Sequence, residues 1–88
     1  MFKAYIIIKL RPSILDPQGK AMQNALHDLG QASISQVRAG KHIEMMIDVE
    51  ASDEARRIAT QACEQLLANA VMEDFDIQLV EVSNPQAA

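Results

Sequence analysis

Apolar and polar side chains alternate over residues 2–11, which is the period-2 pattern of a β-strand with one buried face. The same alternation returns over residues 42–50 and again over about 73–82. Residues 33–39 alternate less strictly, because Ile34 and Val37 stand three positions apart, and a weaker strand with a bulge or an irregular entry is expected there. Gly40 then marks the turn of a hairpin that joins this strand to the next.

The apolar spacing is helical in two segments of the chain, one between the first and second of these four strands and one between the third and fourth. The first helix is expected to begin at Pro17, with Asp16 as its N-cap, and to end in a left-handed conformation at Gly30. The second is expected to be capped by Ser52 and to end at Asn69, also left-handed. The stripes predicted to face the core are Met22, Ala25, Leu26 and Leu29 in the first helix, and Ala55, Ile58, Ala59, Ala62, Cys63, Leu66 and Leu67 in the second.

The predicted order is therefore β-α-β-β-α-β. With right-handed crossovers this order gives an α+β, ferredoxin-like fold, in which a four-stranded antiparallel sheet carries both helices on one face. Residues 1–82 would form this single domain, and residues 83–88 a polar C-terminal tail. The uncovered face would carry Tyr5, Ile7, Met46, Val80 and Val82. It is too apolar to face water, so we expect a second subunit to cover it in a homo-oligomer, a dimer or a tetramer.

Size and charge narrow the function classes. A chain of 88 residues leaves a large share of its apolar surface uncovered, which favours self-association. The net charge of −4 divides into +4 over residues 1–41 and −8 over residues 42–88, and only three residues are aromatic, so a nucleic-acid partner is not expected. No apolar run is long enough to span a membrane, and the chain opens on a strand pattern rather than a signal peptide, which predicts a cytoplasmic protein.

No set of residues has the spacing of a catalytic or metal site. His27 falls on the polar side of the first helix and His42 beside the predicted turn, and neither has a Cys, Asp or Glu at metal-ligand spacing. Cys63 lies in an apolar stripe, where a thiol stays protonated and inert. We therefore expect no catalytic, metal-binding or cofactor-binding residues in this chain.

Two features predict a protein-docking surface instead. Gly19 stands in the first turn of a helix despite a cost of roughly 1 kcal/mol relative to alanine, which removes a side chain where another backbone could approach. Arg38 and Lys41 flank Gly40 and could donate to carboxylates of a partner. With the helix cap Asp16, these residues are the expected docking site, and Gly19→Ala is expected to be tolerated by the isolated fold.

Three segments together resemble the PurS family, the small subunit of phosphoribosylformylglycinamidine synthase. They are Leu15-Asp16-Pro17-Gln18-Gly19-Lys20-Ala21, Val37-Arg38-Ala39-Gly40-Lys41 and Cys63-Glu64-Gln65-Leu66-Leu67-Ala68-Asn69, and the resemblance runs from Lys3 to about Val82. It implies a non-catalytic subunit that bridges a large synthetase subunit, which uses ATP and Mg, and a glutaminase subunit, and that supports ammonia transfer in the fourth step of purine synthesis. One departure is that Ala70 stands where the family usually has proline, which predicts a looser helix exit.

Two other functions fit the predicted topology. A ferredoxin-like regulatory module that binds a small molecule would need a glycine-rich turn after the first strand, where this chain has Arg11-Pro12-Ser13-Ile14. An RNA-binding domain would need stacking aromatics on the central strands, where Tyr5 is the single candidate.

Overall fold

The computed structural model describes residues 1–83 as a three-stranded antiparallel sheet with two helices. The elements, in chain order, are β1 (Phe2–Leu10), α1 (Pro17–Asp28), β2 (Gly40–Ile47), α2 (Ser52–Ala62), a π-helical turn η1 (Cys63–Leu67) and β3 (Glu73–Glu81). The α+β class and the alternating strands are confirmed. From residue 84 on, the expected polar tail lies outside the described residues.

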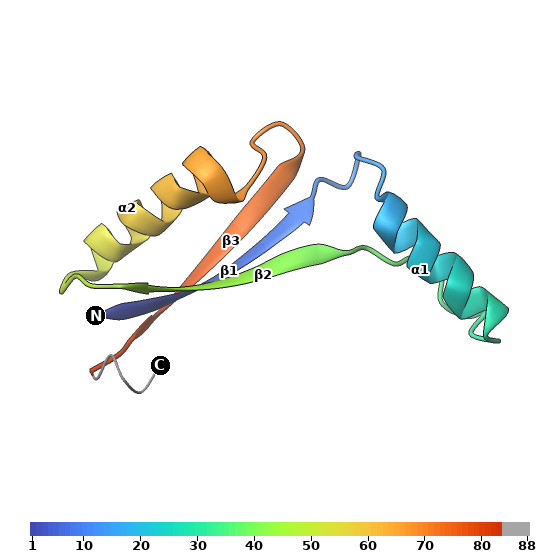
Figure 1. The fold of residues 1–88 in the computed structure, drawn as a ribbon, viewed down its shortest axis with the longest axis horizontal. Helices are drawn as coiled ribbons and strands as arrows, with labels where there is room; N and C mark the ends of the chain where they lie inside the picture. The colour runs from blue at the N-terminus through green and yellow to red at the C-terminus, as the bar shows by residue number, and fades with distance from the viewer. Residues whose placement is uncertain (84–88) are drawn as a thin grey trace.

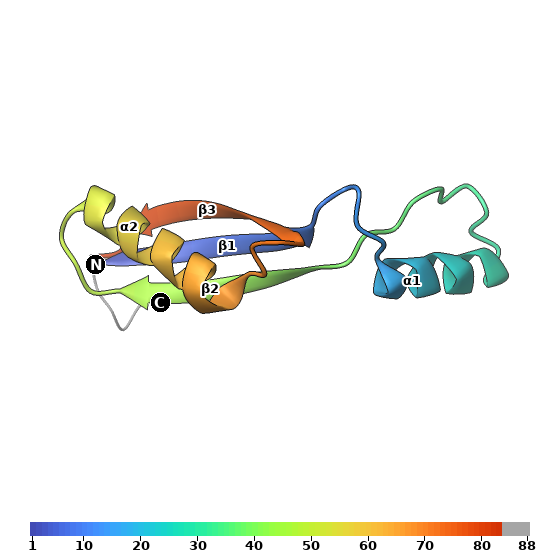
Figure 2. The same cartoon turned by 90° about the horizontal axis from the view of Figure 1, so that it is seen from above.

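β1 is the central strand, in the order β2-β1-β3, and both neighbours run antiparallel to it (Figure 1). The side chains of β1 divide as the alternation predicts: Phe2, Ala4, Ile6 and Ile8 are buried. They belong to the face on which α2 lies, here called the inner face, and the opposite side is the outer face (Figure 2).

The core is small because only α2 packs on the inner face. Ala55, Ala59 and Cys63 are fully buried at successive turns, and their short side chains let α2 lie close to β1 and β3. At Cys63 the helix widens by one residue, as the amide of Ala68 donates to the carbonyl of Cys63 at 2.9 Å. This widening turns Leu66 out to 83% exposure, so its predicted place in the buried stripe is wrong.

The predicted fourth strand and the placement of α1 are corrected by the structure. Residues 33–39 form no strand and Gly40 no hairpin turn; the segment runs directly into β2, which begins at Gly40. α1 projects beyond the end of the sheet instead of lying beside α2 (Figures 1 and 2). The stripe expected to face the core is accordingly uncovered within the chain, with Met22 44% and Leu29 77% exposed.

The helix ends are partly as predicted. Asp16 caps α1, Pro17 is its first residue, and Gly30 adopts a φ of 93° after its end. Ser52 is already helical, and the N-cap is Ala51, which makes no side-chain cap hydrogen bond. Asn69 is not left-handed. Its Oδ1 instead accepts from the amides of Val71 (2.9 Å) and Met72 (3.3 Å), so it closes the turn that leads into β3.

Candidate docking site at the base of a projecting arm

The site expected from the sequence lies where α1 leaves the sheet. We call residues 11–39, which comprise the loop after β1, α1 and the return segment 29–39, the arm. Asp16 is buried at the base of the arm, and its carboxylate holds both sides of it. Oδ1 accepts from the amide of Gly19 at 2.9 Å, and Oδ2 accepts from the amide of Ala39 at 2.6 Å. These backbone donors, helped by the nearby Arg38 guanidinium, hold the pKa of Asp16 below its ordinary value.

Gly19 is also buried, and its missing side chain makes room for the arm's own return segment. A Cβ built on Gly19 would overlap the carbonyl oxygen of Val37 and press on Oδ2 of Asp16 at 2.8 Å. The backbone that approaches is therefore part of the same chain. This corrects the expectation that Gly19→Ala is tolerated, because a backbone carbonyl cannot rotate away as a side chain would.

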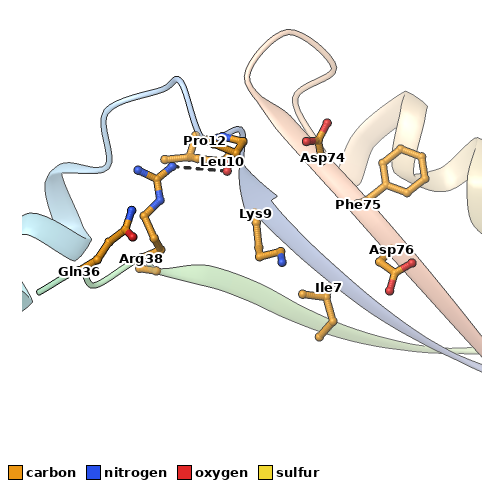
Figure 3. Close-up of a pocket in the computed structure, with 10 residues that line it drawn as sticks. Ile7, Lys9, Leu10, Pro12, Gln36, Arg38, Asp74, Phe75 and Asp76 are labelled. Carbon is orange, nitrogen blue, oxygen red and sulfur yellow. Dashed lines mark hydrogen bonds between the residues drawn. The ribbon is translucent and has the colours of Figure 1, made fainter. Parts of the chain in front are cut away.

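Arg38 fastens the return segment to the loop after β1. Its Nη2 donates to the carbonyl oxygens of Arg11 and Ile14, both at 3.0 Å, and lies 3.5 Å from that of Leu10 (Figure 3). These contacts provide hydrogen-bond donors for the backbone carbonyl groups of a loop that belongs to no helix or strand. The contacts of Asp16, Gly19 and Arg38 together fix the base of the arm in position, and we call this set of contacts the joint.

Lys41 does not flank a turn with Arg38. It pairs in register with Ile8, so its side chain belongs to the inner face, where Nζ lies 3.7 Å from a carboxylate oxygen of Glu73. Gly40, between the two cations, packs against the backbone of β1, since a Cβ there would lie 2.7 Å from the carbonyl oxygen of Ile8. The structure thus brings Asp16, Gly19 and Arg38 together and sets Lys41 apart from them.

Beside the joint, the arm and the outer face enclose an open hollow of about 850 Å³ (Figure 3). Lys9 and Arg38 bring two positive charges to it, and Asp74 and Asp76 bring two negative charges. The side chain of Arg11 also pairs with Asp74 at 3.1 Å. Balanced charges in a wide hollow suit a polypeptide surface with its own mixed charges better than a single small ion.

The outer face has the apolar residues predicted for it. Ile7, Met46 and Val80 are 38%, 39% and 42% exposed, and Tyr5 and Val82 are half-buried. An ion pair lies among them: Nζ of Lys3 contacts Glu44 at 3.0 Å and lies 5.1 Å from the Tyr5 ring centroid. The hydrogen bond between Lys3 and Glu44 lowers the pKa of Glu44 and raises that of Lys3.

The groups weighed for catalysis have partners within the chain. Nε2 of His27 lies 2.5 Å from the carbonyl oxygen of Ile34, and Nε2 of His42 lies 3.2 Å from Glu44. Cys63 is fully buried, and burial raises the pKa of its thiol. Over residues 1–83, His, Cys, Asp and Glu side chains form no group of three that could hold a metal ion, and no helix is long and apolar enough to cross a membrane.

One exposed apolar cluster was missed by the sequence analysis. Leu66, Val71 and Met72 are 83%, 77% and 40% exposed around the turn between η1 and β3. Ala70, next to Val71 in the sequence, helps to line a second hollow of about 430 Å³ together with Cys63, Ala68 and Phe75. The signal in the sequence was the pair Val71-Met72, two apolar residues between elements and outside any predicted stripe.

Comparison with known proteins agrees with the resemblance. The family model described as "PurS: Phosphoribosylformylglycinamidine (FGAM) synthase" matches residues 3–81. Among relatives named as the PurS subunit of this synthase, that of Mycobacterium leprae is 47% identical over 78 residues, covering 88% of this chain and 94% of the relative. That of Bacillus subtilis is 39% identical over 82 residues, covering 93% and 96%.

Solved structures show the same fold. Crystalline PurS from B. subtilis superposes with a TM-score of 0.84 at 37% identity, covering 92% of this chain and all of that one. A structure of PurLQS from Thermotoga maritima contains a chain with a TM-score of 0.80 at 26% identity, covering 91% of this chain and 99% of that one. On the family match across nearly its whole length, this chain belongs to the PurS family.

Proposed function

We propose that this chain is the small, non-catalytic subunit of a phosphoribosylformylglycinamidine synthase, an ATP-dependent glutamine amidoligase of purine biosynthesis. The observation that carries the proposal is the family match over residues 3–81, together with the similarity to a chain of the PurLQS structure. The partners would be a large synthetase subunit, which uses ATP and Mg, and a glutaminase subunit, all in the cytoplasm. The chain would bridge the two and support the transfer of ammonia between them.

The chemistry of the described residues supports a subunit that acts by contact. The single thiol is buried with a raised pKa, and both histidines are engaged by neighbouring groups of the same chain. What the chain offers to a partner is surface: the mixed-charge hollow, the outer face and the Leu66-Val71-Met72 cluster.

The proposed docking site is centred on Arg38, Gly40 and Lys41, which are exposed. Asp16 and Gly19 are buried, so they would contribute by fixing the position of the arm rather than by touching the partner. Of the two cations at this site, Lys41 is the freer to exchange its contact, because its ion pair with Glu73 is long, at 3.7 Å, and its side chain is 59% exposed.

The function is tested by reconstituting the three subunits. With glutamine as the nitrogen source, synthesis of formylglycinamidine ribonucleotide should require this chain; with ammonium in excess, the synthetase should retain activity without it. Unchanged glutamine-dependent synthesis when the chain is omitted would contradict the proposal.

The docking site is tested by co-elution of Arg38→Ala/Lys41→Ala with the two larger subunits. We expect weaker assembly, while Arg56→Ala/Arg57→Ala, which removes two exposed cations from α2, should assemble like the wild type. Arg38 also holds the arm, so its loss could weaken assembly through lower stability. Lys41→Ala alone, and thermal melting of each variant of this chain by itself, separate a lost contact from a lost fold. If all variants assemble normally, the docking assignment is wrong.

A further inference from the structure

Two opposite charges at the hollow beside the joint have no ionic partner within the part of the chain that the structure describes. Lys9 of β1 and Asp74 of β3 are register partners on the outer face, where opposite charges directly across two strands ordinarily attract each other. Asp74 instead accepts from Nε of Arg11 at 3.1 Å. Among residues 1–83, no ion pair includes Lys9 or Asp76. The ammonium of Lys9 and the carboxylate of Asp76 therefore remain available to a ligand.

The charges around the hollow are sorted by sign. Arg38 lies on the side of the arm, Lys9 in the middle, and Asp74 and Asp76 on the side of β3 (Figure 3). Asp74 and Asp76 stand two positions apart on one strand, so both side chains project from the outer face. Arg38 is held by its hydrogen bonds to the loop after β1, and Asp74 by its ion pair with Arg11. Each side of the hollow thus has one anchored charge and one free charge of the same sign.

Apolar side chains complete the lining. Ile7, the register partner of Asp76, lines the hollow and is 38% exposed, and Pro12 lines it from the loop after β1. The volume of about 850 Å³ lies within the roughly 300–1,000 Å³ of small-molecule sites, which combine an apolar lining with a few placed polar groups. The hollow has the size and the composition of such a site.

The charges decide which small molecules fit. A lone anion would be repelled by the two carboxylates on β3, and a lone cation by the two cations on the opposite side. An uncharged molecule would displace water from the free charges without replacing its hydrogen bonds, which costs free energy. A small zwitterion brings one charge for each side. The rest of that molecule should be uncharged, because the charges are then balanced, and apolar where it meets Ile7 and Pro12.

We propose that the hollow binds a free α-amino acid with an apolar side chain. The carboxylate of the ligand pairs with the ammonium of Lys9, its ammonium pairs with the carboxylate of Asp76, and its side chain lies on Ile7. Arg38 and Asp74 each add a charge of the matching sign to their side of the hollow. Every group that holds the ligand belongs to this chain, so the site is independent of the proposed function.

Chemical-shift titration of the isotope-labelled full chain, in the assembly that it forms in solution, tests the ligand class with L-leucine as the probe. We expect saturable shifts of the backbone amides around Lys9 and Asp76 at millimolar leucine. Two analogues each lack one charge: 4-methylpentanoate lacks the ammonium, and 3-methylbutylamine lacks the carboxylate. Each should bind at least about tenfold more weakly than leucine, because it loses one charge-assisted contact. An analogue that binds as tightly as leucine, or the absence of a saturable shift with leucine, overturns the proposal.

The same titration on variants tests the residues. Lys9→Gln and Asp76→Asn each remove one charge and keep a polar side chain, and each should weaken leucine binding at least about tenfold. Lys20→Gln is the matched control, because it removes an exposed cation of α1 that does not line the hollow, and it should bind like the wild type. All three side chains are exposed, so the amide spectra should retain the wild-type fold. Wild-type affinity in Lys9→Gln or in Asp76→Asn overturns the proposal and leaves the hollow to a polypeptide partner.

Discussion

At the scale of single residues, the base of the arm is held by a few side chains, each of which makes contacts that few other residue types could make. One buried carboxylate accepts from two amides that lie 20 residues apart in sequence, those of Gly19 and Ala39. Gly19 allows α1 and the return segment to lie in contact, and Nη2 of Arg38 donates hydrogen bonds to two carbonyl oxygens of the loop after β1. These are contacts in which neither partner can move without opening the joint.

Gly19→Ala is expected to destabilise the chain by a net of about 1–2 kcal/mol, because overpacking against a fixed carbonyl, which costs up to about 3 kcal/mol, outweighs the gain of roughly 1 kcal/mol in helix propensity. Urea denaturation of the free subunit measures the change. Lys20→Ala, the next position of the same helix and exposed, should stay within about 0.5 kcal/mol of wild type. Equal stability of Gly19→Ala and wild type would mean that the return segment yields easily.

Asp16 makes part of the stability depend on pH. Its pKa in the folded chain lies below the ordinary value of 3.8, so its contribution is complete above that value and is lost as the pH falls through the lowered pKa. The free energy of unfolding should therefore fall less between about pH 5 and pH 2 in Asp16→Asn than in wild type. Glu44→Gln, which removes a carboxylate of lowered pKa from the exposed outer face, should change this slope less. Parallel curves for wild type and Asp16→Asn would contradict the assignment.

At the scale of elements, the sequence predicted what local pattern determines. The alternation over residues 2–11 and about 73–82 predicted the strands β1 and β3 and the side chains that face α2, and Asp16-Pro17 and Gly30 predicted the ends of α1. The prediction from sequence failed where contacts between distant parts of the chain determine the structure. Residues 33–39 have a partial strand pattern, but within one chain the ties of Ala39 to Asp16 and of Arg38 to the loop after β1 hold them beside α1 and that loop. Likewise, no spacing distinguishes a π-turn at Cys63 from a regular helix end.

The turn after η1 places residue 70, an alanine here, at a position where proline is favoured. Asn69 begins a turn in which Met72 donates to the carbonyl of Asn69 at 3.2 Å, and Ala70 is its second residue, the position at which proline is favoured. Ala70→Pro should raise stability by about 0.4–1 kcal/mol through a less flexible unfolded chain. Val71→Pro is the matched control and should lower it, because the Val71 amide donates to Asn69. Thermal melting compares the two, and a destabilised Ala70→Pro would place this turn outside the conformation that proline accepts.

At the scale of the whole molecule, exposed apolar residues lie in several separate places on the chain. The arm lies beyond the end of the sheet, the outer face lies opposite α2, and Leu66, Val71 and Met72 lie in η1 and the turn that follows it (Figure 2). In the proposed assembly with larger subunits, each of these surfaces could be covered by a different neighbour.

Ile7→Lys tests the outer face. We expect this face to pair copies, so the charge should lower the mass of the assembly while leaving the helix and strand content of the chain unchanged, because Ile7 is already 38% exposed in the single chain. Gln65→Lys places the same charge at an exposed position on η1 and should preserve the mass. An unaltered mass for Ile7→Lys would assign the outer face to a different protein or to solvent.

The thinness of the chain has a consequence for the proposed transfer of ammonia. It is one sheet and one helix deep (Figure 1), and the interior of that layer is filled by side chains such as Ile6, Ile8 and Cys63. A layer of this depth cannot enclose a passage by itself. Any conduit that carries a small neutral molecule past this subunit must run along one of its faces, with the remaining walls supplied by its neighbours. The conduit would then exist only in the assembled complex, and ammonia released from an incomplete one would escape into water.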